Sequence, residues 1–163
     1  MIQFQFPPAG RCCQWVDGRI RTLQCPGSDS LFERLFKKPA PLTGAPSIRR
    51  QKTYSAQSGY VYQYYYEGNR RYRRDGEEGV EFVFDVSADR KTSAGVSVYV
   101  TDEAVAAWEQ KHGRALVSSE RYATAKMALF QAFDERANPG LMKQDVRVRA
   151  ADMEAILSSL GID

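Results

Sequence analysis

Tyrosine and arginine side chains are concentrated in one stretch of this chain, between residues 54 and 100. Tyrosines occupy alternate positions before an arginine-rich turn; these residues are Tyr60, Tyr62, Tyr64, Tyr66, Arg70, Arg71, Arg73 and Arg74. Aromatic rings stack on the bases of single-stranded nucleic acids and guanidinium groups hold their phosphates, so nucleic-acid binding is one chemistry that these residue types support. Tyrosine and arginine are also enriched at the energetic centres of protein interfaces, because they bury large areas and keep directional polar groups.

Acidic residues next to the arginines favour a protein ligand. A tight turn at 75–76 would place Arg74 opposite Glu77 on the next strand. The same register places Arg73 opposite Glu78, so that these charges would form cross-strand ion pairs on a protruding hairpin. Arginines neutralised in this way are less available to phosphates, and the stretch does not match the aromatic signature of an RNA-recognition domain.

We therefore expect a protein-binding surface with Tyr72 as its main anchor. The candidate binding residues are Tyr65, Arg70, Arg71, Tyr72, Arg73, Arg74 and Tyr99. The expected partner is another protein or a second copy of the chain, as a homodimer. Single-stranded nucleic acid is the alternative ligand. It would use the same residues together with Arg49, Arg50 and Lys52, and its affinity would fall steeply with salt.

Residue types that carry catalysis are sparse in this sequence. It contains one histidine, His112, and no phosphate-cradling glycine loop, nucleophile elbow or HExxH motif. The cysteines Cys12, Cys13 and Cys25 include no CxxC pair, so we expect reduced thiols, no metal and no cofactor. The favoured interpretation is a non-enzymatic interaction or accessory module. An enzyme of unknown class is the third interpretation, and it would need a pocket near Cys12, Cys13 or the tyrosines.

Charge is unevenly distributed along the chain, although the net charge is only +3. The first 74 residues contain 13 Lys and Arg against 4 Asp and Glu, whereas the remainder contains 10 against 16. We interpret this asymmetry as two halves that neutralise each other on folding or across a dimer; an acidic partner for the first half is the alternative.

Composition is that of a globular protein, with 43% hydrophobic and 26% charged residues. No apolar run approaches the roughly 20 residues that a membrane-spanning helix needs. The N-terminus has neither the basic segment nor the continuous apolar segment of a secretory signal, so we expect a cytoplasmic protein that does not contact a membrane.

Alternating apolar residues predict an antiparallel β-meander around 54–101. Segments 81–86 and 96–100 have an apolar residue at every even position, which is typical of strands with one buried face. The tyrosine strand precedes them, and its even-numbered tyrosines are expected to face the core or its rim. A tight turn at 75–76 would instead turn the odd-numbered side chains inward. A one-residue bulge at Gly68 would restore the even set, which is the arrangement we prefer.

A β-hairpin is also predicted over 11–24. Asp17-Gly18 is a favoured two-residue hairpin turn, and it places Trp15 opposite Ile20. The segment 26–52 is rich in proline and glycine and is predicted to be irregular or linker-like, with a short amphipathic helix at 31–38.

Helices are predicted for the C-terminal part. Thr101 is expected to cap a helix that stops at Gly113, and further helices are expected over about 118–137 and 152–160. A short edge strand is expected at 147–149. The sequence thus predicts one α+β domain over 1–163, with an antiparallel sheet packed on one face by the C-terminal helices.

Overall fold

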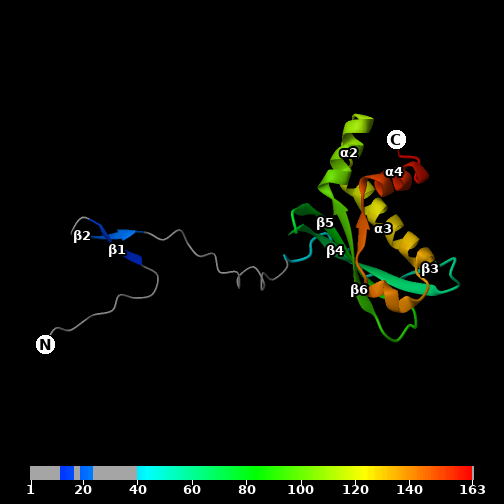
Figure 1. The fold of residues 1–163 in the computed structure, drawn as a ribbon. Coiled ribbons are helices and arrows are strands. Elements are labelled where there is room, and N and C mark those ends of the chain that lie inside the picture. The colour runs from blue at the N-terminus through cyan, green and yellow to red at the C-terminus, as the bar shows by residue number, and fades with distance from the viewer. Residues whose placement is uncertain (1–11, 17–18, 24–39, 163) are drawn as a thin grey trace. The chain divides into compact units, whose positions relative to one another are not determined.

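The computed structural model describes residues 12–16, 19–23 and 40–162. The chain divides into two units, residues 1–39 and 40–163. In the first, β1 (Cys12–Val16) and β2 (Arg19–Leu23) form an antiparallel two-stranded sheet (Figure 1). Trp15 lies opposite Ile20, which confirms the predicted register. The Asp17-Gly18 turn, Cys25 and the predicted helix at 31–38 lie outside the described residues, as does the predicted irregular segment up to residue 39.

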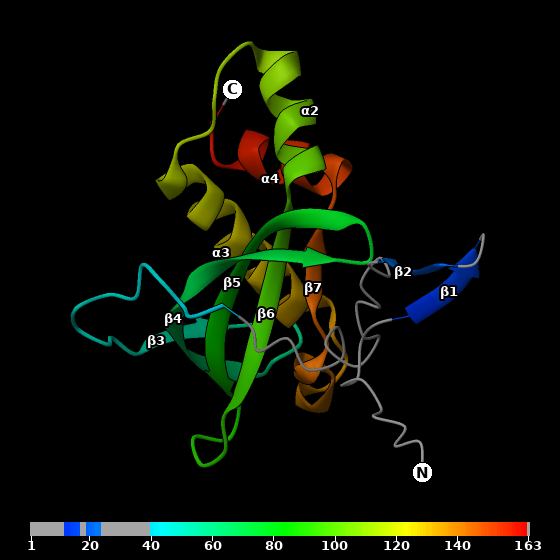
Figure 2. The same ribbon diagram turned by 90° about the vertical axis from the view of Figure 1, so that its left-hand side faces the viewer.

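The second unit is built on a five-stranded sheet in the order β3-β4-β5-β6-β7, whose strands are all labelled in Figure 2. Its strands are β3 (Lys52–Ser55), β4 (Val61–Arg74), β5 (Glu77–Ser87), β6 (Ala94–Thr101) and β7 (Val146–Val148). Strands β3 to β6 are antiparallel to one another, which confirms the predicted meander. The short edge strand expected at 147–149 is also present as β7, but it pairs in parallel with β6.

A β-bulge interrupts β4 between Tyr66 and Gly68, as the sequence predicted. Tyr66 lies opposite Phe84 and Gly68 opposite Val83, so Glu67 is the additional residue on this strand. The bulge reverses the alternation of side chains along β4. Even-numbered residues face the helices before the bulge, and odd-numbered residues face them after it.

The tyrosines before the bulge accordingly point inward. Tyr62 and Tyr64 are 0% and 3% exposed, and Tyr66 is half-buried. Tyr60, which precedes the strand, is 40% exposed and lies at the rim of the core, in contact with the ring of Tyr62. At the far end of β4, the residues of the 75–76 turn both have positive φ angles, which is the geometry of a tight hairpin turn.

Gly68 also allows an upstream segment to approach the edge of β4. Thr43 and Asn69 exchange two backbone hydrogen bonds of 2.8 Å. The φ angle of Gly68 is 137°, and a Cβ atom there would lie 2.7 Å from the carbonyl oxygen of Thr43. A glycine is therefore needed at this position, because any side chain would separate the segment around Thr43 from the strand.

Helices α2 (Asp102–His112), α3 (Ser118–Glu135) and α4 (Ala150–Ser159) follow β6, with a 3-10 helix, η1 (Pro139–Lys143), after α3. In Figure 2 the strands lie in front of α3, while α2 and α4 pack together beyond one end of the sheet. The C-terminal helices thus pack on one face, and the predicted α+β fold is confirmed. None of the described helices covers the other face of the sheet.

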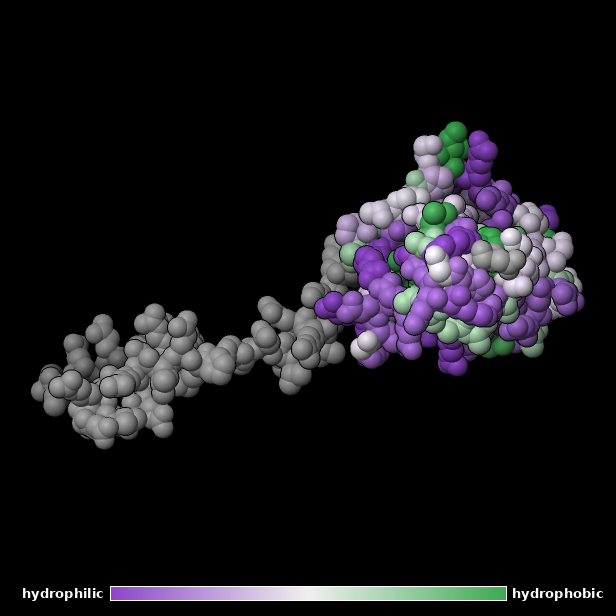
Figure 3. Space-filling view, turned by 90° about the horizontal axis from the view of Figure 1, so that it is seen from above, coloured by the Kyte–Doolittle hydropathy of each residue, from purple (hydrophilic) through white to green (hydrophobic). Residues whose placement is uncertain are grey.

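The core lies between the sheet and the helices. The ring of Tyr62 stacks on Phe133, and that of Tyr54 on Phe130, with centroids 4.2 Å apart in each pair. The other large side chains that are almost fully buried include Phe84, Val96, Val98, Leu129, Met153, Ile156 and Leu157. Viewed from the end where α2 lies, the surface is mainly hydrophilic, with small separate groups of apolar side chains (Figure 3).

Thr101 caps α2 as predicted. Its Oγ1 accepts a hydrogen bond of 3.1 Å from the backbone N–H of Ala104, and Gly113 ends the helix in the left-handed conformation. We expect Thr101→Ala to lower the free energy of unfolding by about 1 kcal/mol, because an unpaired amide is left at the helix start. Urea unfolding measures this loss. Thr101→Ser keeps the hydroxyl and should retain most of the stability; an equal loss in both variants would show that the methyl group matters and the cap does not.

Candidate functional site

The seven predicted binding residues are divided between the two faces of the sheet. Phe82 is buried against the helices, so its neighbour Glu81 lies on the helix-free face, together with Arg70 opposite it. The same alternation places Tyr65, Arg70, Tyr72, Arg74 and Tyr99 on the helix-free face, and Arg71 and Arg73 on the other. The structure thus brings most of the candidates, but not all, to one surface.

Arg70 is held in an ion pair with a buried carboxylate. Its Nε donates to Oε2 of Glu81 at 2.5 Å and its Nη2 donates to Oε1 at 3.0 Å, while Ser97 Oγ donates to Oε1 at 2.6 Å. Glu81 is only 4% exposed. Burial alone would raise its pKa, but the hydrogen bonds from Arg70 and Ser97 outweigh burial and hold the pKa of Glu81 below its ordinary value. Arg70 is therefore committed to the fold.

The other arginines of the hairpin also have acidic partners within the chain. Arg71 donates from Nη1 and Nη2 to the two oxygens of Asp102, at 2.9 and 2.6 Å. Arg73 Nε lies 2.7 Å from Glu78, which confirms the predicted cross-strand pair. Arg74 lies opposite Glu77 as predicted, but it pairs with its neighbour on the turn, Asp75, at 3.4 Å instead.

Glu77 instead pairs with an arginine of β7, a strand that was not predicted to contact it. Arg147 of β7 donates from Nη1 to Glu77 Oε2. The guanidinium of Arg147 also lies 5.8 Å from the ring centroid of Tyr99. The predicted ion pair between Arg74 and Glu77 is therefore wrong, because the parallel strand β7 supplies a competing arginine on the same face.

Tyr72 and Tyr99 contact each other across β5. Their ring centroids are 4.8 Å apart and the rings meet edge to face. Gly79 of β5 lies opposite Tyr72, and a Cβ atom there would come within 2.9 Å of Tyr72 Cε1. The hydroxyl oxygen of Tyr72 is buried and finds no hydrogen-bond partner in the described part of the chain. Tyr72 is thus half-buried, and its hydroxyl is available to a partner only if the surface around it rearranges.

Tyr65 is at a separate place on the helix-free face. Its hydroxyl donates to Gln51 Oε1 at 2.7 Å, and the guanidinium of Arg49 lies 4.1 Å from the ring centroid. Arg49 in turn donates to Glu67 and Asp85, and these hydrogen bonds raise its pKa. Tyr65 and Arg49 therefore support the packing of the segment around residue 50 against the sheet.

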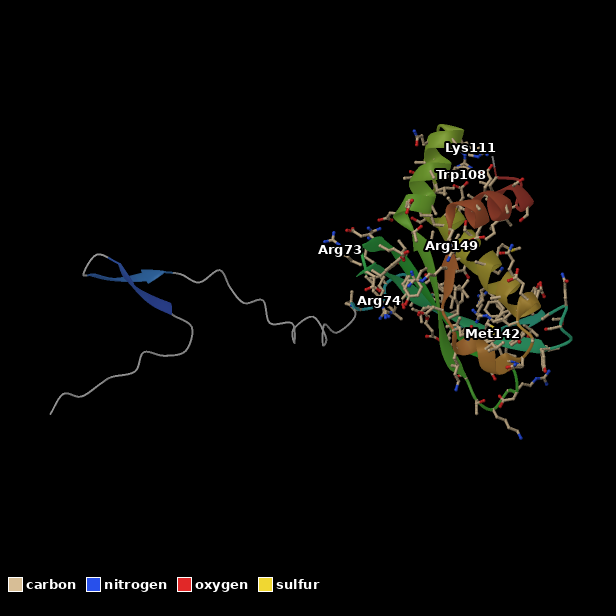
Figure 4. The ribbon with its side chains drawn as sticks, viewed as in Figure 1. Arg73, Arg74, Trp108, Lys111, Met142 and Arg149 are labelled. Carbon is tan, nitrogen blue, oxygen red and sulfur yellow. The ribbon has the colours of Figure 1, made fainter. Side chains whose placement is uncertain are left out.

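The exposed part of the predicted site is the tip of the β4–β5 hairpin. Figure 4 shows Arg73 and Arg74 at this tip, where the end of the hairpin extends past the body of the sheet. Their side chains are 77% and 69% exposed, and that of Asp75 is 80% exposed. We call residues 73–78 the hairpin tip. It presents positive and negative charges within six residues of sequence.

A pocket that the sequence did not predict lies on the opposite, helix-bearing side of β4. Its volume is about 570 Å³, and it opens between β4, the segment 44–52 and the start of α3. The residues that line it are Gly44, Pro46, Ser47, Ile48, Arg50, Lys52, Tyr66, Asn69, Phe82, Ser118, Ser119 and Tyr122. We call it the Tyr66 pocket. Four segments form it, namely 44–52, the middle of β4, Phe82 of β5 and the start of α3, so neither motif nor spacing indicated it. The sequence indicated Arg50 and Lys52 only as part of the alternative nucleic-acid surface.

The Tyr66 pocket combines aromatic and cationic side chains. Tyrosine and phenylalanine rings supply apolar surface, and Arg50 and Lys52 supply positive charge. The described residues that line it include no carboxylate, imidazole or thiol. An enzyme interpretation required a pocket beside the tyrosine strand; this pocket is in that position, and Lys52, Tyr66 and Tyr122 are the titratable side chains, besides Arg50, that line it.

Metal sites and membrane-spanning helices are both absent from the part of the chain that the structure describes. Over those residues, no three His, Cys, Asp or Glu side chains gather where a metal ion could be held. Within the same ranges, none of the helices combines the length and the apolar character that crossing a bilayer requires. Comparison with protein families, with curated proteins and with solved structures finds no match to this chain.

Proposed function

We propose that this chain is a cytoplasmic protein-interaction module that associates through the hairpin tip, most simply with a second copy of itself. The observation that supports this proposal is the exposure of Arg73 and Arg74 at the end of a hairpin that projects from the sheet (Figure 4). Side chains of this kind, placed beyond the body of the fold, are free to enter an interface without disturbing the core.

Charge at the hairpin tip supports a second copy as the partner. Arg73 and Arg74 are followed within four residues by Asp75, Glu77 and Glu78. In a two-fold symmetric contact each patch meets its own copy, so a patch that carries both signs can complement itself. Tyr72 of this hairpin meets Tyr99 of the neighbouring strand β6 edge to face, and the pair supplies aromatic area on the helix-free face next to the charges.

Charge reversal at the hairpin tip tests this proposal. We expect Arg73→Glu and Glu78→Arg each to weaken self-association by about tenfold or more, because like charges then meet across the two-fold axis. An equimolar mixture of the two variants should recover the affinity, since acidic and basic tips complement each other. Light scattering over a concentration series gives the masses, against 18.4 kDa for one chain.

The mixture separates an interface from a folding defect. A variant that merely unfolds would not be rescued by the other variant. A wild-type chain that stays monomeric at every concentration would contradict the proposal, and so would variants that associate as the wild type does.

Single-stranded nucleic acid is the weaker candidate, because Arg70, Arg71, Arg73 and Arg74 have acidic partners in their own chain. The same light-scattering series with a mixed-sequence oligonucleotide tests it. Binding at low salt that disappears at moderate salt is the result that counterion release requires. A flat salt response, or no binding at low salt, would remove this candidate.

A further inference from the structure

The Tyr66 pocket has the size and shape of a small-molecule site. A volume of about 570 Å³ falls within the range of roughly 300–1,000 Å³ that is usual for ligand pockets. Phe82, Tyr66 and Tyr122 contribute aromatic rings; Tyr66 and Tyr122 lie 4.8 Å apart between centroids and meet at 58°. Ile48, which is 63% exposed, adds an apolar side chain from the segment that forms the outer wall.

A chain of hydrogen bonds fixes one polar group in the wall of the pocket. Asn69 Nδ2 donates to the hydroxyl of Tyr66 at 2.8 Å, and Thr43 Oγ1 holds Asn69 in turn, lying 3.1 Å from its backbone carbonyl oxygen and 3.4 Å from its Oδ1. Because the Tyr66 oxygen accepts this bond, its own proton can be donated to an acceptor in the pocket. Burial raises the pKa of Tyr66, so the hydroxyl keeps that proton at neutral pH.

Positive charge gathers on one side of the pocket without nearby acidic partners. Arg50 and Lys52 line it, and neither forms an ion pair with any residue in the described ranges. Lys126 of α3 is a third cation nearby. Its pKa is lowered mainly by burial and, second, by the charge of Lys52. The arginines of the sheet are matched with carboxylates, whereas Arg50 and Lys52 lie together at one pocket and have no acidic partner among the described residues.

We propose that the Tyr66 pocket binds a small organic anion that has a flat apolar body. The body would lie against the rings of Phe82, Tyr66 and Tyr122, and the anionic group would meet Arg50 and Lys52. Ser118 and Ser119 line the same pocket at the start of α3, and their hydroxyls can donate hydrogen bonds to the anionic group. The pocket shares no residue with the hairpin tip, and its function is independent of self-association.

The probe for this proposal is 8-anilino-1-naphthalenesulfonate, an aromatic sulfonate that fluoresces when shielded from water. Its neutral analogue, N-phenyl-1-naphthylamine, has the same aromatic body without the charge. We expect saturable binding of one sulfonate probe per chain, about tenfold tighter than the neutral analogue, because a hydrogen-bonded charge adds about 1.5 kcal/mol or more.

Neutral substitutions of the two cations then identify the site. The double variant Arg50→Gln with Lys52→Gln should bind the sulfonate about tenfold more weakly and the neutral analogue nearly unchanged. The matched control, Lys91→Gln with Lys143→Gln, removes the same charge from two exposed lysines outside the pocket lining and should bind both probes as the wild type does. Equal losses in the two double variants would overturn the proposal, since only net charge would then matter.

A pocket-filling variant tests whether the probes bind elsewhere on the protein. Ser119 is exposed at the mouth of the pocket, so Ser119→Trp should leave the fold intact and abolish binding of both probes. Retained thermal unfolding temperatures confirm that each variant is folded. Wild-type affinity of both probes in the Ser119→Trp variant would refute the assignment to this pocket.

Discussion

Replacing Arg70 with alanine should lower the free energy of unfolding by about 3 kcal/mol, as measured by urea unfolding at neutral pH. The side chains of Arg70 and Glu81 are only 22% and 6% exposed. Without Arg70, the Glu81 carboxylate stays buried with only the hydroxyls of Ser97 and Tyr99 as donors. A buried charge that loses its partner is far more costly than an exposed one, because water cannot replace the lost hydrogen bonds.

The matched control lies three residues along the same strand. Arg73 pairs with Glu78 across the same hairpin, but its side chain is 77% exposed. Arg73→Ala should therefore cost less than about 0.5 kcal/mol, since water and salt screen exposed pairs. Similar losses at Arg70 and Arg73 would show that the two pairs contribute alike and that burial of Glu81 is not the cause.

Acid unfolding provides a second measurement on the same pair. The pKa of Glu81 is lower in the folded protein than its ordinary value of 4.5. As the pH falls, the unfolded chain therefore binds more protons than the folded one. The stabilisation that the Glu81 carboxylate contributes is complete above its ordinary pKa. It is lost as the pH falls through the pKa that Glu81 has in the folded protein. Glu81→Gln should remove this dependence and give a shallower loss of stability between neutral and acidic pH than the wild type.

Gly79→Ala should also be strongly destabilising, by about 3 kcal/mol. A Cβ atom at residue 79 would lie 2.2 Å from the carbonyl oxygen of Val100 and 2.9 Å from Tyr72 Cε1. Because the closest atom belongs to the backbone of β6, the clash cannot be relieved by rotating a side chain. The pairing of β5 with β6 must open locally, and Tyr72 must move away from Tyr99.

Gly95 provides the control for this substitution. It lies in β6, as Gly79 lies in β5, but a Cβ atom there would have no neighbour within 4 Å. Gly95→Ala should be neutral or slightly stabilising, because alanine restricts the unfolded chain without disturbing the folded one. Urea unfolding of both variants decides the matter; equal stabilities would mean that the sheet accommodates a methyl group at residue 79.

Local patterns of the sequence predicted much of this fold. Apolar residues at even positions indicated which side of β5 and β6 is buried. A tight turn at 75–76 would have turned the odd-numbered side chains of the tyrosine strand inward, whereas the sequence pattern favoured the even-numbered ones, and a bulge at Gly68 reconciles the two. Thr101 and Gly113 marked the ends of α2 through capping chemistry that involves only neighbouring residues. Each of these features depends on residues close in sequence.

Features that depend on distant segments were not predicted. The partner of Glu77 is Arg147, some 70 residues away, because β7 returns alongside β6 in parallel. The Tyr66 pocket requires the segment 44–52, the middle of β4 and the start of α3 to meet. Residue types at these positions are ordinary, and only the three-dimensional arrangement gives them a common surface. The burial of Glu81 is a related case: alternation along β5 places this carboxylate on the helix-free face, where Arg70 and neighbouring side chains nevertheless cover it.

The parallel pairing of β7 has a consequence for the order in which the chain can fold. Neighbouring strands from β3 to β6 are close in sequence, so their contacts close short loops, whereas β7 reaches β6 only after α2, α3 and η1 have been traversed. Any partly folded state in which β7 is undocked leaves the hydrogen-bonding edge of β6 open beside Val98 and Val100. An open apolar edge is a template for pairing with other chains, so the docking of three residues, Val146–Val148, protects the folding chain from aggregation.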